Sequence, residues 1–358
     1  MGAYPIGLEM SLRPTTMEDG TGKASPKLPW ALWKKFMVVG IFLVIAIPLG
    51  VILGVSLTGK FNNKGSNSSD GKNSLWQPSV ADSWQIVLLK PIEIGDDAVV
   101  TPDVGIYDID VYDNDAVTIQ ALQASGKKVI CYFSAGSWEN WRDDRDDFEK
   151  ADLGKVMDGW PDERWVDVRS DNVRSIMKKR IEFAAGKGCD AIDPDNVDGF
   201  VSLPLSIDGT TIIRRITAEG QNDNGLDLTA EDAVDFIKFL AETAGSYGMS
   251  TGLKNAGDII PDVLDYVHFS VNEQCIEYSE CETFAAFIRA DKPVFNIEYP
   301  AGTPDDVAPS AIKEICSETG NSTGTSGFST VIKNLNLDGW VEYCGQKETY
   351  TTELDTSA

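Results

Sequence analysis

The stretch SDNVRSIMKKRIEFAAGKGCDAIDPDNVDG, residues 170–199, contains the unit on which the fold prediction rests. It opens with a Ser170–Asp171 helix cap, and its helical part ends in Gly188, a residue type that commonly follows a helix. The short apolar run DAID, residues 190–193, comes next and predicts a strand. A helix, a strand and a polar loop in this order are typical of an α/β protein with a parallel sheet.

Similar units extend from this stretch towards both ends of the chain. Residues 113–126 and 228–248 predict helices, the second with a Thr229 cap and apolar residues three and four positions apart. Residues 90–103 are too rich in Pro, Gly and Asp for a regular helix, so the first crossover should be degenerate. The alternation predicts a (β/α)8 barrel of the TIM type. The eight predicted strands are residues 84–89, 104–109, 128–133, 190–193, 250–254, 266–271, 293–298 and 329–334.

A membrane anchor is predicted ahead of the barrel. Residues 36–57 are 22 consecutive uncharged positions, long enough for one transmembrane helix. Basic residues on the N-terminal side favour a disordered cytosolic tail over residues 1–35 and a type II topology. Residues 58–75 are rich in Gly, Ser, Asn and Lys, which predicts a flexible stalk. Residues 76–358 would then form the domain outside the cytosol, lumenal or at the cell surface.

Two further features agree with an oxidising location outside the cytosol. Asn67 and Asn321 lie in glycosylation sequons, and all six cysteines follow the predicted membrane segment. Two local disulfides are expected, Cys275–Cys281 and Cys316–Cys344. The remaining cysteines, Cys131 and Cys189, either join neighbouring strands or are buried thiols.

The charge of the chain limits its partners. The formal net charge is −25, which disfavours binding to nucleic acid or anionic lipid and suits a cationic ligand, although solubility alone explains it as well. The only histidine, His268, lies within a predicted strand and is expected to be a core residue. Asp and Glu are therefore the expected acid–base groups, and no metal or organic cofactor is implied.

Polar residues recur at the carboxyl ends of the predicted strands. Active sites of TIM-type barrels lie at this end, where strands give way to loops. Six strands that direct polar side chains into one mouth therefore predict a site there. These residues are Asp108 and Asp110, Tyr132 and Ser134, Asp193 and Asp195, Lys254 and Asn255, Asn272 and Glu273, and Asn296 and Glu298.

The acidic motif DPDNVDG has two readings besides an active site. A calcium loop of the EF-hand type would begin at Asp193, but the later ligand positions, from Val197 to Pro204, do not fit it. Alternatively, the motif is a strand end followed by a capped turn, in which Asp195 or Asn196 holds backbone amides. Asp193 is different, because it ends an apolar run and should point into the barrel mouth.

A carboxylate pair is expected across that mouth. Glu273 occupies the place after its strand that Asp193 occupies after DAI, and two such groups are the apparatus of glycoside hydrolysis. Glu273 could equally be an ordinary loop acid. Trp138 and Trp141, which follow the third strand, could stack on sugar rings or could pack at the barrel rim.

The chain resembles glycoside hydrolase family 114 over roughly residues 84–345, in the motifs WQIVL, YDID, VICYFSAGSWENWR, GCDAIDPDNVDG, DLTAEDAVDFIKFLAETAGSYGMSTGLKNA and YVHFSVNEQC. Members are endo-α-1,4-polygalactosaminidases with a barrel catalytic domain. The resemblance implies endo-hydrolysis of α-1,4-linked galactosamine polymers, such as the galactosaminogalactan of fungal walls, and this substrate is a cationic polysaccharide. By motif match, the catalytic carboxylates fall on Asp193 and Glu273. The residues implied along the sugar subsites are Asp108, Asp110, Tyr132, Asp195, Asn196, Lys254 and Glu298.

One segment departs from the family pattern. Members run almost directly from NVDG to DNGLDLT, whereas residues 201–222 are interposed here. They predict either a surface loop at the barrel mouth or a translated, retained intron that keeps the reading frame. Two functions compete with the one implied: a catalytically silent barrel that binds glycan at the cell surface, and a hydrolase of another glycan.

Overall fold

The computed structural model describes residues 75–95, 99–200, 205–207, 210–212, 224–346 and 348–356. The chain divides into two units, Met1–Asp70 and Gly71–Ala358, and all described residues lie in the second. The predicted membrane span, residues 36–57, lies outside them, as do the predicted tail and nearly all of the predicted stalk. None of the helices that the structure describes is long and apolar enough to cross a bilayer.

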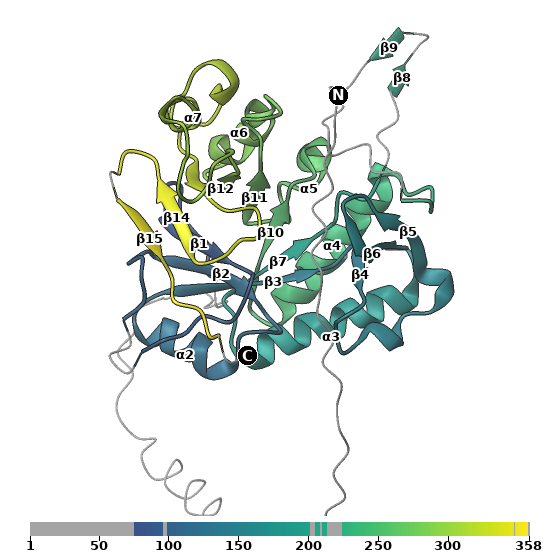
Figure 1. Cartoon of the computed structure of the whole chain (residues 1–358). Coiled ribbons are helices and arrows are strands. Elements are labelled where there is room, and N and C mark those ends of the chain that lie inside the picture. Colours follow the sequence, from purple (N-terminus) through teal and green to yellow (C-terminus); the bar gives the residue numbers. More distant parts are fainter. Residues whose placement is uncertain are drawn as a thin grey trace, which may run out of the picture. The chain divides into compact units, whose positions relative to one another are not determined.

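A ten-stranded sheet forms the centre of the second unit (Figure 1). Its first eight strands pair in parallel, each with the next along the sheet, and the last two are antiparallel. In sheet order the strands are β1 (Trp84–Val87), β2 (Ile106–Asp110), β3 (Lys128–Ser134), β7 (Ala191–Asp195), β10 (Ser250–Lys254), β11 (Phe269–Glu273), β12 (Val294–Glu298), β13 (Ser329–Ile332), β14 (Trp340–Tyr343) and β15 (Thr349–Thr351).

The sheet curls until its first strand lies beside its eighth. Side chains on successive strand positions face opposite sides, and one set, from Trp84 on β1 to Val331 on β13, packs into a single buried inner cluster. The Trp84 and Phe295 rings are 4.9 Å apart, and the Trp84 indole donates to the Ser329 carbonyl at 2.8 Å. The predicted α/β class is confirmed, and the curled sheet is consistent with a TIM-type barrel.

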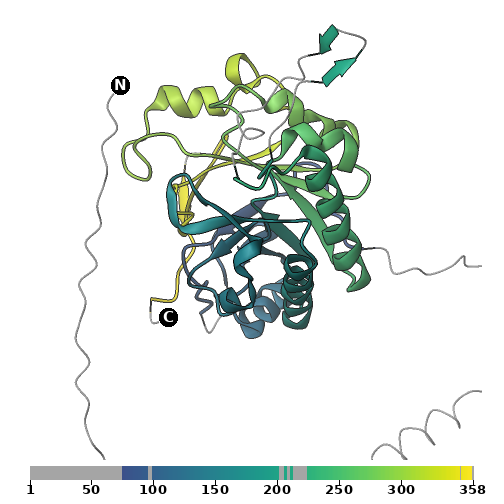
Figure 2. The same ribbon diagram turned by 90° about the vertical axis from the view of Figure 1, so that its right-hand side faces the viewer.

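Helices cover the outer side of the sheet and complete a second core (Figures 1 and 2). Ser170 accepts hydrogen bonds from Asn172 and Val173, and Gly188 ends the same helix at φ 92°, a conformation that glycine adopts without strain. Thr229 caps the next long helix through the Asp232 amide. The three predicted helices are therefore present, as α2 (Ala116–Ala124), α3 (Asp171–Lys187) and α4 (Ala230–Ser246).

Several elements were not predicted from the sequence. The most consequential is a three-stranded antiparallel sheet that interrupts the chain between β3 and α3. It consists of β4 (Ser137–Glu139), β5 (Leu153–Met157) and β6 (Trp160–Val166). The others are the short helices α5 (Ile260–Val263), α6 (Cys281–Arg289) and α7 (Pro309–Ile315), the 3-10 turns η1 (Arg145–Asp147), η2 (Lys150–Asp152), η3 (Gly257–Ile259) and η4 (Gly320–Ser322), and the C-terminal hairpin β14–β15.

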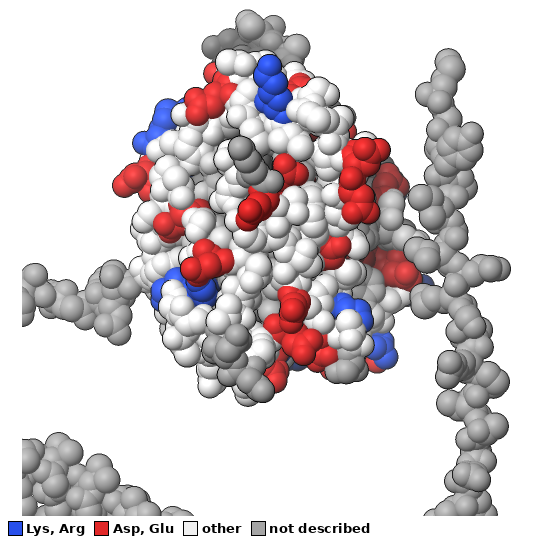
Figure 3. All heavy atoms as spheres, turned by 60° about the vertical axis from the view of Figure 1, so that its left-hand side comes forward, with Lys and Arg blue, Asp and Glu red and all other residues white. Residues whose placement is uncertain are grey.

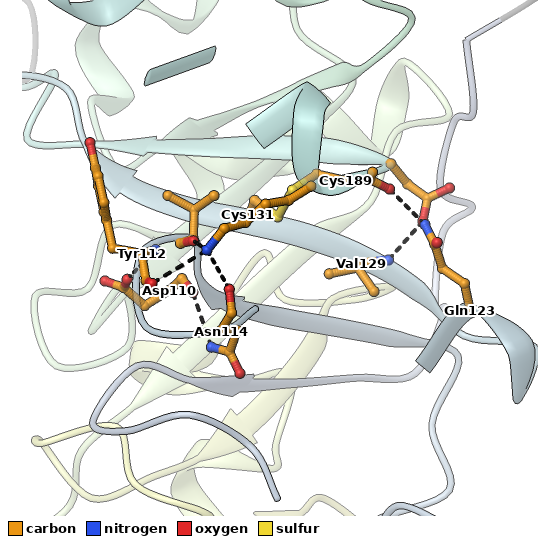
Figure 4. Close-up of a disulfide and its surroundings, with 11 residues drawn as sticks. Asp110, Tyr112, Asn114, Gln123, Val129, Cys131 and Cys189 are labelled. Carbon is orange, nitrogen blue, oxygen red and sulfur yellow. Dashed lines mark hydrogen bonds between the residues drawn. A yellow bond between two sulfur atoms is a disulfide. The ribbon is translucent and has the colours of Figure 1, made fainter. Parts of the chain in front are cut away.

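Three disulfides link the six cysteines. Cys275–Cys281 and Cys316–Cys344 are the predicted local pairs. Of the two alternatives left for the remaining cysteines, the disulfide is correct. Cys131 on β3 is bonded to Cys189, which lies just before β7, so the bond ties neighbouring strands across 58 residues of chain (Figure 4). A cross-link over a loop of this length stabilises the fold chiefly by restricting the unfolded chain.

The interposed segment, residues 201–222, is described only in part. Its described residues form β8 (Leu205–Ile207) and β9 (Thr210–Ile212), which pair with each other antiparallel. The rest of the segment lies outside the described residues.

Candidate active site

Two adjoining cavities open at the carboxyl ends of the strands. They share seven lining residues, among them Glu273 at the end of β11 and Trp160, which is 55% exposed at the start of β6. We call the cavity lined by Asp110 and Trp141 the acidic arm and the cavity lined by Gln274 and Tyr278 the neutral arm. Their volumes are about 490 Å³ and 570 Å³, within the range of ligand-binding pockets.

The charges that are not shared differ between the arms. The acidic arm has five carboxylates and two cations of its own, whereas the neutral arm has Asp158 and Lys155. The seven charged residues specific to the acidic arm are Asp110, Asp113, Glu139, Glu163, Asp195, Arg142 and Lys254. A cationic ligand is therefore favoured more strongly in the acidic arm.

Strand β7 presents two carboxylates at different depths. Asp193 and Asp195 are two positions apart and face the same side of the sheet, because side chains alternate along a strand. Asp195 lines the acidic arm, where it accepts hydrogen bonds from the Tyr132 hydroxyl at 2.8 Å and from the Asn196 amide at 2.7 Å. Asp193 lies deeper and is completely buried.

Asp193 lies next to a second buried carboxyl group, that of Asp108 on β2. Neither group accepts a hydrogen bond from an ordinary donor among the described residues. Burial, together with the charge of Asp193, raises the pKa of Asp108 well above its usual range, so Asp108 is held in its neutral form beside Asp193. Burial also raises the pKa of Asp193, although the Lys254 ammonium acts in the opposite direction.

Lys254, at the end of β10, lies between the carboxylates of both strand ends. Its Nζ is 3.4 Å from Asp195 Oδ2 and 3.5 Å from Glu273 Oε2, and only 2% of the residue is exposed. Burial alone would lower the pKa of Lys254, but the Asp195 and Glu273 charges outweigh it and raise the pKa well above its usual range. The side chain is therefore a fixed positive charge at the centre of the site.

Glu273 is held as a carboxylate at the junction of the two arms. The Tyr299 hydroxyl donates to Oε1 at 2.5 Å, and Asn255 Nδ2 donates to Oε2 at 3.2 Å. Asn255 Oδ1 also accepts the Glu273 amide at 2.9 Å, which fixes the backbone at this point. Burial would raise the pKa of Glu273, but the Lys254 ammonium and these hydrogen bonds lower it.

The glycoside-hydrolase family GH114 has a model that matches residues 65–349. The chain belongs to family GH114. It is therefore a glycoside hydrolase. Its sequence is 47% identical to Ega3 of Aspergillus fumigatus, whose crystal structure contains galactosamine; the match covers 77% of this chain and 100% of Ega3, with a TM-score of 0.65.

A more distant structural likeness comes from a bacterium. The glycoside hydrolase domain of PelA from Pseudomonas aeruginosa, solved as the E218A variant, is 11% identical, with 71% of this chain and 95% of that chain covered and a TM-score of 0.51. At this identity, the likeness concerns the fold alone. A search of curated proteins found no match.

Most of the site residues expected for this GH114 chain line the cavities. Asp110, Tyr132, Asp195, Asn196, Lys254 and Glu273 do so, whereas Asp108 and Asp193 are buried beneath them. Glu298 is not among the cavity-lining residues. It follows inward-facing Ile297 on β12, so it faces away from the barrel interior, where it accepts the Ile276 amide at 2.9 Å.

The remaining expectations concern residues near the mouth. Trp141 is 49% exposed in the acidic arm, while the Trp138 indole donates to the Arg145 carbonyl and packs against the core. His268 lies just before β11, not within it, and is half-buried, so the expectation of a core histidine inside a strand is wrong; its ring accepts a hydrogen bond from the Thr251 amide at 3.1 Å.

Three site residues escaped the sequence analysis: Tyr299, Glu163 and Trp160. Alternation along β12 would have found Tyr299, because Phe295 and Ile297 face inward and position 299 continues that set. Glu163 and Trp160 lie on β6, a strand of the unpredicted antiparallel sheet. No pattern in the sequence around these two residues indicates that β6 reaches the barrel mouth.

Proposed function

We propose that this GH114 chain is an endo-acting hydrolase of α-1,4-linked galactosamine polymers. Glu273, at the junction of the two arms, is the observation on which the endo mode rests. An endo-acting enzyme holds sugar units on both sides of the bond that it cleaves, which requires a cavity on each side of the catalytic group. The 47% identity to Ega3, solved with galactosamine, supports the substrate class.

The acidic character of the chain supports a cationic polymer. Carboxylates in the acidic arm outnumber the cations there, and the chain as a whole has a formal net charge of −25. On the face of the molecule in Figure 3, acidic side chains are spread widely with fewer basic ones between them. Such a field raises the local concentration of a polycation and speeds its encounter with the cleft.

Asp193 and Glu273 divide the two chemical roles in this proposal. The environment raises the pKa of Asp193 and lowers the pKa of Glu273, and such divergence is typical of paired catalytic carboxylates. Asp193 is then the general acid that protonates the leaving oxygen, and Glu273 is the nucleophile or the base. Asp108, held neutral, adds no further negative charge beside Asp193, and Lys254 keeps Glu273 ionised.

Asp195 is a second candidate for the partner of Glu273. Its carboxylate lines the acidic arm, while both Asp193 oxygens are buried. Under the main proposal Asp195 binds sugar hydroxyl or amino groups, with Tyr132 and Asn196 beside it, and the leaving oxygen reaches Asp193 at the floor of the arm.

We also propose a type II membrane anchor through residues 36–57, with the barrel outside the cytosol. The three disulfides support this location, because such bonds persist in oxidising compartments. Protease added to sealed vesicles whose cytosolic face points outward, and which contain the full chain, should remove the N-terminal tail and spare the barrel. Digestion of the barrel without detergent would overturn the topology.

The activity is tested on the full-length chain in detergent. Wild type and Glu273→Gln are incubated with partly deacetylated α-1,4-galactosaminan, and released oligosaccharides are analysed by mass spectrometry. Wild type should release oligomers of several lengths, and the variant should lose turnover by at least about 10³-fold because the ionised carboxylate is gone. Polymer that is bound but left intact by wild type would favour the glycan-binding alternative. Cleavage of other glycans alone would reassign the substrate.

A further inference from the structure

One carboxylate of the acidic arm lacks the neutralising partner that its neighbours have. Arg142 binds Asp110 through both terminal nitrogens, at 3.1 and 2.5 Å, and binds Glu139 through Nε at 2.9 Å. Lys254 in turn lies against Asp195 and Glu273. The two cations of the arm are therefore occupied by other carboxylates.

Glu163 is the carboxylate left over. It lies on β6, is 9% exposed and lines the acidic arm. Among the described residues it forms no ion pair, and its hydrogen-bond donor is the Ser137 hydroxyl, at 2.7 Å from Oε2. On the antiparallel ladder it stands directly opposite Glu139, and like charges in this position destabilise a sheet. An unfavourable placement of this kind indicates a function other than stability.

The orientation of Glu163 is fixed by a chain of hydroxyl groups. Ser137 Oγ is 2.6 Å from Ser134 Oγ, and Asn196 Nδ2 donates to both, at 3.1 and 3.0 Å. Gly136 permits this close approach, since a Cβ there would lie 1.7 Å from the Asn196 carbonyl oxygen. Glu163 is thereby linked, through Asn196, to the end of β7 where Asp193 and Asp195 lie.

Building on the proposed function, we propose that Glu163 binds the free amino group of a galactosamine unit in the acidic arm. A primary ammonium supplies the missing cation, whereas an N-acetyl group supplies no charge and adds bulk. Glu163 lines the acidic arm and does not line the neutral arm. The neutral arm, with Asp158 and Lys155, accepts units with or without the acetyl group, so selection for the free amine operates on one side of the cleaved bond.

The test uses the full-length chain and two galactosamine polymers, one fully deacetylated and one partly N-acetylated. Glu163→Gln keeps the side-chain shape and the oxygen that accepts from Ser137 but removes the charge. Its KM for the deacetylated polymer should rise by about 10-fold or more, with kcat within about threefold of wild type. Its KM for the acetylated polymer should change much less, so the preference for free amines falls.

Two further variants serve as controls for the charge of Glu163. Glu163→Asp keeps the charge and should retain more of the preference than Glu163→Gln. Asp146→Asn removes one exposed carboxylate, 88% exposed outside the cleft, and should leave the preference unchanged. If folded Glu163→Gln had an unchanged KM, or an equal rise in KM on both polymers, this inference would be wrong. The proposed function would still hold as long as wild type cleaves the polymer. Absence of cleavage by wild type would remove both.

Discussion

The acidic and the neutral arm share Glu273 and one barrel mouth, but different parts of the fold supply the rest of their walls. The acidic arm is walled by the ends of β2 and β7 and by the antiparallel sheet that carries Glu139 and Glu163. The neutral arm is walled by the β5–β6 turn and by Gln274, Tyr278 and Tyr299, which follow β11 and β12. The strands therefore position the chemistry, while chain excursions beyond the strands set the charge on each side.

Within the acidic arm, the carboxylates that stabilise the fold are different from the carboxylate that we assign to substrate binding. Arg142 and Glu139 form part of a buried ion network that includes Arg180, whose guanidinium is 3.6 Å from Glu139. That network holds the antiparallel sheet against the barrel. Glu163, on the neighbouring strand, forms no ion pair with any residue that the structure describes. A buried carboxylate without a cation is costly, and the cost is offset when a substrate ammonium binds.

The largest expected effect tests which of the two β7 carboxylates, Asp193 or Asp195, takes part in the chemistry with Glu273. Asp193→Asn should lower kcat on galactosamine polymer by about 10²–10⁴-fold, because the proton donor is lost. Asp195→Asn should mainly raise KM, because its carboxylate lines the acidic arm. Steady-state rates of both folded variants decide the question, with thermal unfolding as the control. Near-normal kcat in Asp193→Asn, with a collapse in Asp195→Asn, would exchange the two roles.

An intermediate effect is expected from pH. Burial, together with the charges of Glu139 and Asp195, raises the pKa of Glu163 to about 7, although Ser137 and Arg142 act in the opposite direction. A raised carboxylate pKa means that the negative charge is lost as pH falls through about 7. Because the sugar amine titrates in the same interval, the expected quantity is the KM of wild type divided by that of Glu163→Gln on deacetylated polymer, which should rise by up to about 10-fold from pH 8 to pH 6.

The control for this profile is Glu163→Gln, which has no charge to lose at position 163. Its KM should vary less over the same interval, and the ratio of the two KM values at each pH isolates Glu163 from the catalytic groups. Parallel profiles in wild type and variant would show that another group is responsible.

The smallest effect is expected from two exposed aromatic rings, Trp141 and Tyr278, each of which lines one arm alone. Trp141→Ala and Tyr278→Ala should each raise KM by about 3- to 10-fold, because each removes a surface on which a sugar ring can stack. The acidic arm should lose affinity for deacetylated oligomers, and the neutral arm should lose affinity for both forms. The distribution of product lengths, measured by mass spectrometry, should shift in opposite directions in Trp141→Ala and Tyr278→Ala. The same shift in both variants would show that the two arms do not differ in how they bind the polymer.

Much of the barrel could be predicted because its signals are local. Each of the eight strands is a short apolar run, and alternation within it fixes which side chains face inward, as with Asp193 and Lys254. The helix caps at Ser170 and Thr229 likewise depend on only a few neighbouring residues. Glu298 shows the limit of this approach: its charge suggested the site, but its register turned it outward.

Local sequence patterns were enough to predict the parallel α/β fold, the strand ends that meet at the mouth and the excess of acidic groups. They could not show that Cys131 pairs with Cys189, that Asp193 lies beneath Asp195, or that the β4–β6 sheet brings Glu163 to the cleft. The reason is the range of the interactions. Strand and cap patterns arise between close neighbours in the chain, whereas depth, charge compensation and cavity walls arise between segments that meet only after folding.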